Sequence, residues 1–335
     1  MDRALIWFGI LCLALLAYVV LDGFDLGIGL LFPLGGDDQQ RGLMMDSIAP
    51  VWDGNETWLV LGGGGLLAAF PLAYSVLLTA FYMPVIVMLL ALILRGVAFE
   101  YRSRTVRGRW VWGWSFTGGS ALAAFCQGVM VGAWVQGVRV EQGAYAGGWF
   151  DWLSPFSVLC GLALVCGYAL LGACWLVMKT EGELQARLRR LQMPLGALTI
   201  GFIGLVSFGT LMVSEGVRAR WLGGAVQGQV LFLWLIPMLT AGFGLWFARA
   251  VRHERERTPF VLALALFGAA FAGLGASLFP YLVPPSITYD QAANPDSSLA
   301  FMLVGTLVLL PVILAYTAHN YWVFRGKIRP GEGYH

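Results

Sequence analysis

The stretch Trp52-Asp53-Gly54-Asn55-Glu56-Thr57-Trp58 places two carboxylates, one amide and two indoles directly before a long apolar run, residues 59–70. A second acidic pair stands upstream, in Asp22-Gly23-Phe24-Asp25, within another apolar run. An Asp at the centre of a membrane helix costs about 2.5–3.5 kcal/mol on insertion scales, so such a residue normally faces a partner, water or a proton route. The two stretches therefore predict membrane helices that carry acidic sites.

The composition of the whole chain agrees with a membrane protein. Of its 335 residues, 59% are hydrophobic and only 12% are charged, whereas a soluble domain carries roughly 25% charged residues. The first apolar segment, about residues 4–32, is too long for the apolar part of a signal peptide and lacks a cleavage site of small residues. We expect it to remain in the protein as the first helix.

Apolar runs of about 20 residues, the length that crosses a bilayer, recur along the chain. They predict an all-α integral membrane protein with about nine transmembrane helices, at roughly residues 4–32, 56–72, 76–99, 111–135, 155–178, 194–213, 228–250, 259–279 and 299–324. We expect a single polytopic domain, residues 1–335, built as two four-helix bundles plus one peripheral helix. The approximate halves are residues 1–140 and 150–335, and the second half includes the peripheral helix.

The distribution of positive charge predicts the orientation, because cytoplasmic loops of membrane proteins are rich in Lys and Arg. Basic clusters follow the third, fifth, seventh and ninth predicted spans, whereas the loop after the fourth carries Arg139 alone. The loop after the sixth span, with Arg218 and Arg220, is a mild exception. An odd number of spans then puts the N-terminus outside and the C-terminus in the cytoplasm.

This orientation brings several polar residues to one side of the membrane. Asp25 lies about 10 Å from the cytoplasmic end of the first span, Asp53 precedes the second, and Arg95 and Glu100 stand in the last turns of the third. We therefore expect these four residues to converge at similar depth. Asp22 shares a helix face with Asp25, so the two carboxyls can exchange or share protons.

Each acid also has a structural interpretation that the sequence leaves open. Asp25 is either a proton or ion site, or a carboxylate that pairs with Arg95 or caps a neighbouring helix. Asp53 suits the N-cap of the second span, where Asp accepts hydrogen bonds from free amides. Glu100 stands beside a basic run and could be a solvated charge at the membrane surface.

Redox cofactors are not indicated by the residues of this chain. It has three histidines, His253, His319 and His335, of which one lies in a predicted span, and a pair of haems needs several axial His or Met ligands. The five cysteines lie in apolar segments without a Cys-x-x-Cys pair, so we expect no metal or disulfide site. We expect this chain to hold no haem and no metal.

Four motifs of this chain resemble subunit II of the cytochrome bd-type quinol oxidases, over essentially its whole length. They are Asp22-Gly23-Phe24-Asp25-Leu26-Gly27, Ser47-Ile48-Ala49-Pro50-Val51-Trp52-Asp53-Gly54-Asn55-Glu56-Thr57-Trp58, Phe99-Glu100-Tyr101-Arg102-Ser103 and Tyr316-Thr317-Ala318-His319-Asn320-Tyr321-Trp322-Val323-Phe324-Arg325-Gly326-Lys327. The Asn55-Glu56-Thr57-Trp58 version is compatible with the cyanide-insensitive branch of that family.

The resemblance implies a nine-helix subunit of a respiratory oxidase in the bacterial cytoplasmic membrane. In that family a haem-bearing subunit I oxidises quinol and reduces oxygen to water. Carried over by position, Asp25, Asp53 and Glu100 would form a cytoplasmic proton path, which Asp22, Asn55 and Arg95 would support. Position 100 is often Asp in the family, so Glu100 changes the reach of the acid. Trp58 resembles a tryptophan near a lateral oxygen access route, at the lipid side.

The expected partners follow from the same resemblance. They are subunit I, membrane lipids and the quinol pool, while a small accessory subunit and a structural quinone in this chain stay open. We expect no nucleic acid partner. Two alternatives remain at this stage, namely a stand-alone ion-coupled secondary transporter and a purely structural scaffold for subunit I. The acids cluster toward one face instead of the bilayer midplane, which argues against a transporter.

Overall fold

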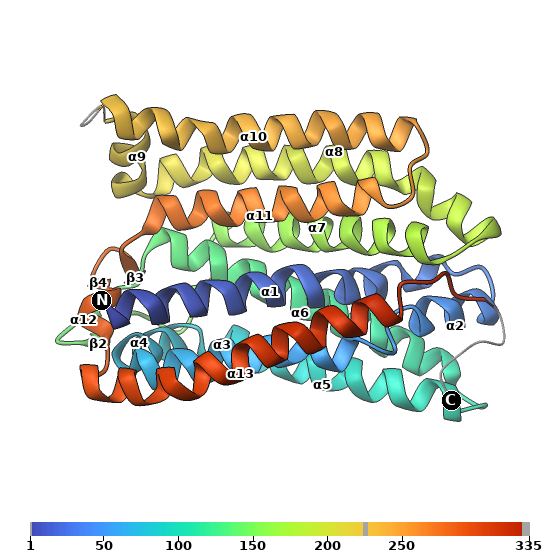
Figure 1. Cartoon of the computed structure of the whole chain (residues 1–335), viewed down its shortest axis with the longest axis horizontal. Coiled ribbons are helices and arrows are strands. Elements are labelled where there is room, and N and C mark those ends of the chain that lie inside the picture. Colours follow the sequence, from blue (N-terminus) through green and yellow to red (C-terminus); the bar gives the residue numbers. More distant parts are fainter. Residues whose placement is uncertain (1, 224–226, 330–335) are drawn as a thin grey trace.

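The computed structural model describes residues 2–223 and 227–329, and long helices that run back and forth along one axis dominate it (Figure 1). The long helices are α1 (Arg3–Leu31), α3 (Trp52–Ala69), α5 (Tyr82–Arg104), α6 (Arg109–Gln136), α7 (Pro155–Lys179), α8 (Gly182–Val213), α10 (Gln227–Arg252), α11 (Thr258–Leu278) and α13 (Asp296–Val323). The connections carry η1 (Phe32–Leu34), α2 (Asp38–Asp46), α4 (Pro71–Ala80), α9 (Glu215–Leu222), α12 (Tyr289–Ala292), and the two antiparallel pairs β1 (Val140–Glu141) with β2 (Ala144–Tyr145) and β3 (Tyr281–Val283) with β4 (Ile287–Thr288).

The predicted all-helical membrane fold is confirmed. Within the described residues, eight helices are long and apolar enough to cross a membrane. The exception among the long helices is α3, whose first turns carry Asp53, Asn55 and Glu56 and are therefore polar. It nevertheless runs alongside the others (Figure 1). The predicted nine crossings are therefore reached only if α3 crosses the membrane together with the eight apolar helices.

The predicted second and third spans differ from the helices in this region. The chain forms three helices here, because α3 stops before Phe70, α4 begins with Pro71 at its first position, and α5 starts after Phe81. A proline has no amide hydrogen to donate, so it suits the first turn of a helix and interrupts a continuous one. The segment predicted as one loop between the two spans is thus a short helix.

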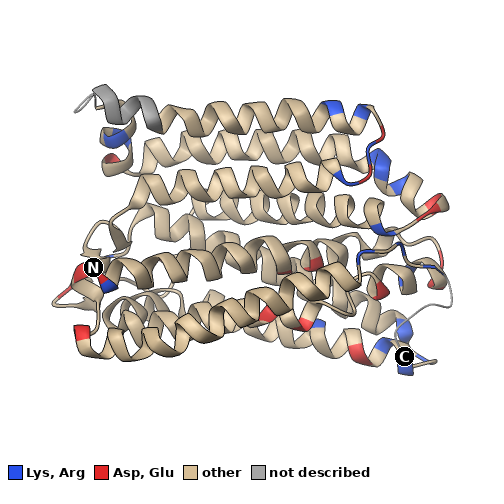
Figure 2. Ribbon diagram, in the orientation of Figure 1, with Lys and Arg blue, Asp and Glu red and all other residues tan. Residues whose placement is uncertain are grey.

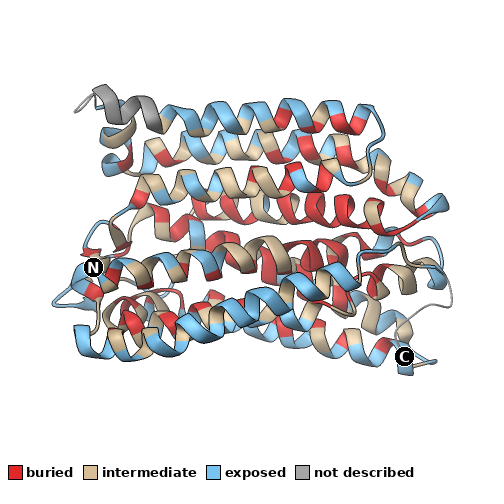
Figure 3. Ribbon diagram, viewed as in Figure 1, coloured by how far each residue is buried: buried red, intermediate tan, exposed pale blue. Residues whose placement is uncertain are grey.

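The long helices pack as two groups of four and one outer helix. In the first group α1 packs against α3 and α6, and α6 packs against α5, whereas α7, α8, α10 and α11 form the second group. The groups meet where α7 packs against α1 and α6. Helix α13 packs against α1 and α3 of the first group, although it follows the second in sequence, and most of its surface is exposed (Figure 3).

Lys and Arg gather at the end of the molecule that carries the C mark in Figure 2. This end, called the basic end below, is where α1, α5, α7, α10 and α13 finish. The opposite end holds the N-terminus, α4, α9, α12 and both strand pairs (Figure 1). The loops expected to be rich in Lys and Arg therefore lie together at one end of the bundle, and the loops with few of these residues lie at the other.

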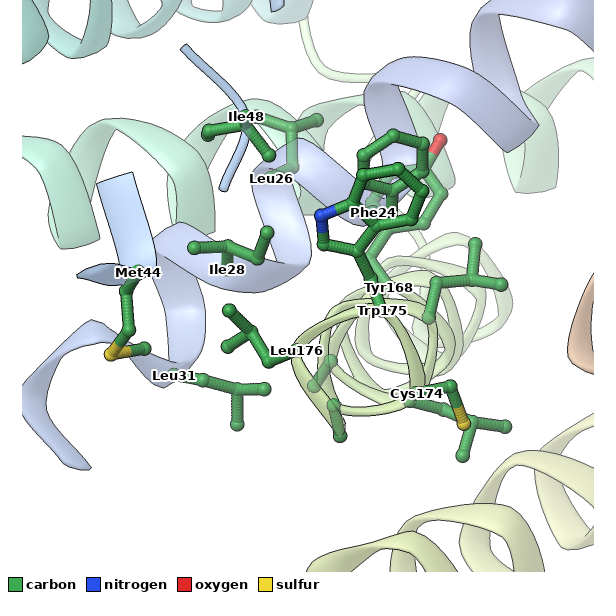
Figure 4. Close-up of a cluster of buried hydrophobic side chains, with 14 of the residues drawn as sticks. Phe24, Leu26, Ile28, Leu31, Met44, Ile48, Tyr168, Cys174, Trp175 and Leu176 are labelled. Atoms are coloured by element: carbon green, nitrogen blue, oxygen red, sulfur yellow. The ribbon is translucent and has the colours of Figure 1, made fainter. Parts of the chain in front are cut away.

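The core is densest where α1 meets α7 in the half of the molecule toward the basic end (Figures 3 and 4). Phe24 stacks on Trp175, with ring centroids 4.3 Å apart and planes 19° apart. The backbones of the two helices approach closely at Gly27 and Gly172, where an added Cβ on Gly27 would lie 1.9 Å from the carbonyl oxygen of Tyr168. Small residues of this kind let membrane helices approach closely enough for extensive van der Waals contact.

At the basic end, the start of α2 is tied to the helix ends around it. Asp38 accepts hydrogen bonds from the guanidinium groups of Arg102 at the end of α5 and Arg109 at the start of α6. The bond from Arg109, with help from the charge of Arg102, holds the pKa of Asp38 below its usual value. This clamp fixes the connection that leads from α1 to α3.

The α1–α7 contact predicts that Gly27→Ala is strongly destabilising. Overpacking of this kind typically costs about 1–3 kcal/mol, and here the obstacle is rigid backbone. Gly9→Ala on the same helix is the matched control, because its added Cβ would meet nothing within 4 Å. Thermal unfolding of both variants in detergent should show a lower Tm for Gly27→Ala only. Equal Tm values would mean that α1 and α7 are not in close contact.

The Asp38 clamp predicts a pH-dependent contribution to stability. A carboxyl with a lowered folded-state pKa stabilises the fold above the unfolded pKa, about 3.9, and loses this contribution as the pH falls through the folded pKa. Asp38→Asn should therefore lower the Tm at pH 7 by a small, salt-sensitive amount, because the pair is half exposed. The difference from wild type should shrink below about pH 4. A Tm difference that is the same at both pH values would contradict the clamp.

Candidate functional site

A buried ion pair between α1 and α5 forms the centre of the site. Arg95 Nη1 donates to Asp22 Oδ1 at 2.8 Å, and the side chains are 1% and 0% exposed. The pair lies on the buried faces of α1 and α5, two helices that are apolar over most of their length. Breaking such a pair by removing one partner leaves an uncompensated charge and typically costs about 3–5 kcal/mol.

The second buried carboxylate, Asp25, is held by the start of α3. Asn55 Nδ2 donates to Asp25 Oδ2 at 2.8 Å, and Asn55 Oδ1 accepts from the hydroxyl of Tyr321 at 2.9 Å. Tyr321 belongs to α13, whose Asn320 also donates to the carbonyl of Pro50 just before α3. Helix α13 therefore fixes the position of α3 and, through Asn55, the orientation of Asp25.

Glu56 is the third carboxylate of the site. Its Oε1 lies 3.6 Å from Arg95 Nη2, and its side chain is 27% exposed. The sequence interpretation did not single it out, although it stands beside Asn55 and three residues after Asp53, which places it on one helix face with Asp53. That spacing was the signal that could have identified it.

Several polar atoms around this centre are buried without a hydrogen-bond partner from the protein. They are Asp22 Oδ2, Asp25 Oδ1, Glu56 Oε1, Arg95 Nη2 and Trp58 Nε1. Buried polar atoms are nearly always paired with protein or ordered water, and buried water typically makes about three hydrogen bonds to such groups. The free atoms around Arg95 therefore provide the hydrogen-bonding partners that a small group of ordered waters needs.

A further polar chain extends from the site into the apolar core. Gln127 of α6 donates to the hydroxyl of Tyr18 at 2.7 Å and accepts from the hydroxyl of Tyr168 at 2.8 Å. Tyr18 lies one helical turn before Asp22 on α1. The sequence interpretation did not include these residues, and Gln127 within an apolar helix was the available signal.

The expected convergence holds in part. Asp22, Asp25, Asn55 and Arg95 are brought together in one buried cluster. Asp53 and Glu100 lie at the same end of the bundle on the surface, where Glu100 is 55% exposed and 4.0 Å from Arg104. Their exposure follows from helical geometry, because Glu100 lies five residues after Arg95 and so points away from it.

Two expectations about the Trp52–Trp58 stretch are wrong in detail. Asp53 is not the N-cap of α3, because the helix begins at Trp52 with Val51 as its N-cap residue, and Asp53 lies within the first turn. Trp58 does not line a lipid-facing surface of this chain, since it is 2% exposed and packs against Ala14 and Tyr18 of α1. The indole is instead packed between α3 and α1.

Among residues 2–223 and 227–329, no three His, Cys, Asp or Glu side chains are arranged to hold a metal ion. His319 is exposed on α13 and lies against Trp322, with ring centroids 5.9 Å apart. The five cysteines are free thiols within helices.

The family model described as "Cytochrome bd terminal oxidase subunit II" matches residues 3–324 of the chain. The chain belongs to this family. It is 32% identical to "Cytochrome bd-I ubiquinol oxidase subunit 2" of Escherichia coli (strain K12), with 96% of this chain and 94% of that protein covered. It is 28% identical to "Cytochrome bd ubiquinol oxidase subunit 2" of Bacillus subtilis (strain 168), with 98% and 97% covered.

The fold of this bd oxidase subunit II also matches a solved structure. A chain of the bd oxidase from Geobacillus thermodenitrificans superimposes with a TM-score of 0.76 at 18% sequence identity, and the match covers 96% of this chain and 99% of that chain. The arrangement of helices that builds the Arg95 cluster is therefore the arrangement of a bd oxidase fold.

The buried pair predicts that Arg95→Gln destabilises the protein by about 3–5 kcal/mol. Asp22 would lose its cation, and no other Lys or Arg within the described residues pairs with it. Arg104→Gln on the same helix is the control, since its side chain is 78% exposed. Unfolding in detergent measures both changes, and the double variant Asp22→Asn/Arg95→Gln should recover part of the loss. An Arg95→Gln protein as stable as Arg104→Gln would contradict the pair.

Proposed function

We propose that this subunit II carries protons from the cytoplasm, through its buried carboxyl cluster, toward the oxygen-reducing site of a bd-type oxidase. The observation that carries the proposal is the set of three carboxyl groups, Asp22, Asp25 and Glu56, gathered around the single guanidinium of Arg95. The chain is a subunit of a terminal oxidase, and its relatives are named as ubiquinol oxidase subunits. It is a multi-pass protein of the bacterial inner membrane.

The charge balance of the cluster supports proton binding. If all three carboxyls were ionised, one guanidinium would leave two negative charges uncompensated, and Asp22 and Asp25 are fully buried. Burying an unpaired charge is strongly unfavourable, and binding a proton removes it. A guanidinium in a protein keeps its charge, so the carboxyls are the groups that gain and lose protons here.

The position of the cluster supports cytoplasmic uptake. It lies in the half of α1 toward the basic end, and we propose that the basic end faces the cytoplasm, as the positive-inside rule requires. Asp53 and Glu100 are exposed on helices at this end. Carboxylates on the outer surface of membrane helices are poorly placed against lipid, so we propose that subunit I covers them.

The remaining chemistry belongs to the partner in this proposal. The haems of subunit I would reduce oxygen to water with electrons from quinol, and this chain's residues would hold and move protons. Asp25 would be the inner proton site, Asp53 and Glu100 the outer sites, and Asn55 and Arg95 would orient and balance them. Oxygen access beside Trp58, a small accessory subunit and a structural quinone stay predictions.

A structural role for the cluster is the alternative that one observation favours. The Arg95–Asp22 pair joins α1 to α5, and this contact alone could hold subunit II in the shape that subunit I requires. The two roles predict different outcomes when a carboxyl is replaced by the amide of the same shape.

Asp25→Asn and Asp53→Asn should each slow oxygen reduction in the assembled complex by about tenfold or more, since a positioned proton donor typically contributes 10²–10⁴-fold. The haem content, from a reduced-minus-oxidised spectrum, should stay normal. Asp290→Asn, an exposed residue at the opposite end, should have no effect on either measurement. Wild-type turnover in both variants would rule out the proton path, and loss of haem in both would assign the carboxylates to assembly.

A further inference from the structure

A hydrogen-bonded connection leads toward Asp25 from the surface, and a second set of polar groups, with no direct hydrogen bonds between them, reaches the same cluster. The first passes through Tyr321 and Asn55 and begins at a cavity of about 200 Å³ at the basic end, which Ser47, Lys179 and Tyr321 help to line. Its last member before Asp25 is an amide. The amide nitrogen of Asn55 is a donor only and its oxygen an acceptor only, so this connection orients Asp25 but does not readily pass a proton to it.

The second connection passes through Glu56. Its side chain is partly exposed, yet its Oε1 is fully buried and has no hydrogen-bond partner from the protein. One turn earlier, Asp53 lies exposed on the same face of α3. A carboxyl group can bind a proton at one oxygen and release it from either, so this connection consists of groups that carry protons.

We propose that Glu56 is a further proton-carrying residue of this subunit, linking exposed Asp53 to the buried Asp22–Asp25 pair. This inference rests on the proposed function and names the group that joins its outer and inner sites. A proton arriving at the Asp53 carboxylate, or from water beside it, binds to the Glu56 carboxylate. The resulting Glu56 carboxyl then releases it through water to the Asp25 carboxylate, and Glu56 returns to its ionised form.

Arg95 has a defined part in this transfer. Its Nη1 is occupied by Asp22, whereas its Nη2 faces Glu56 Oε1 at 3.6 Å and has no hydrogen-bond partner. At that distance the guanidinium attracts the ionised form of Glu56 without a direct hydrogen bond, and a contact beyond hydrogen-bond length between two free polar atoms is one that water commonly bridges. The charge of Arg95 thus favours the return of Glu56 to its ionised form.

The groups that influence Glu56 come from each neighbouring element. They are Asp22, Asp25 and Tyr18 on α1, Asp53 on its own helix, and Arg95 on α5. Asp22 is engaged by Arg95, and Tyr18 by Gln127. Asp22 Oδ2 and Asp25 Oδ1 are both buried without a hydrogen-bond partner. Because only Asp22 is paired with the guanidinium, which favours its ionised form, Asp25 is the carboxyl that more readily keeps the proton from Glu56.

The test uses Glu56→Gln in the assembled complex, with oxygen reduction measured per haem between pH 6 and pH 8.5. We expect turnover to fall about tenfold or more at the alkaline end, where protons are scarce, and less at the acidic end. The solvent deuterium isotope effect on turnover should rise, because proton delivery becomes rate-limiting. Glu56→Asp, which keeps the carboxyl, should recover part of the rate.

Glu215→Gln is the matched control, since Glu215 is 92% exposed at the opposite end of the bundle. It should leave turnover, its pH profile and the isotope effect unchanged. The double variant Asp53→Asn/Glu56→Gln should be no slower than the slower single variant, because two groups in series limit one flow. Multiplied losses in the double variant would show separate paths and overturn the proposal.

The outcomes separate this inference from the proposed function. If Glu56→Gln turns over as wild type at every pH while Asp25→Asn is slow, Glu56 is not in the path and the proposed function stands. If Asp25→Asn is also as fast as wild type, both fail. If Glu56→Gln binds no haem while Glu56→Asp assembles and works at the full rate with an unchanged isotope effect, Glu56 has a structural role and the inference is wrong.

Discussion

The ion pair between Arg95 and Asp22 is the constraint on which the rest of the structure depends. A guanidinium that is 1% exposed within a membrane bundle must keep a counter-charge beside it. Because the two side chains must meet, this requirement fixes the height of α5 along α1 and the rotation of α5 about its own axis. It also decides which side chains can approach, because Glu56 meets the free side of the same guanidinium, and Asp25 lies one turn from Asp22 along α1.

Apolar packing and backbone approach hold this cluster in place. On one side, Gly27 and Gly172 let α1 and α7 come into backbone contact, and the stacked Phe24 and Trp175 close the core next to Asp25 (Figure 4). On the other side, Asn55 of α3 is held by Tyr321 of α13. The site is therefore built by helices from both ends of the sequence, and helix α13 belongs to it in space although it comes last in the chain.

In the proposed function, this subunit serves the oxidase through groups that bind protons. The carboxyl groups around Arg95 are the members of the cluster whose chemistry allows them to bind and release a proton, whereas the amide of Asn55 and the guanidinium of Arg95 keep their form. The polar chain from Tyr18 through Gln127 to Tyr168 is joined by two hydrogen bonds and is buried, so it stiffens the core beside the cluster. Side chains that can bind a proton and side chains that can only orient them therefore lie within a few helical turns of one another.

The sequence by itself determined the membrane fold, the charge asymmetry of its two ends and the approach of Asp25 to Arg95, because hydropathy, basic loops and helical spacing are local properties of the chain. It offered Asp25 as the carboxylate that pairs with Arg95, whereas the structure pairs Arg95 with Asp22. It did not determine which acids are buried. Asp53 and Glu100 stand at the expected end but face outward, Trp58 faces inward, and Glu56 reaches the guanidinium. These outcomes depend on the rotation of α3 and α5 about their axes. That rotation is set by contacts with α1 and α13 that lie far apart in sequence, so only the tertiary structure decided it.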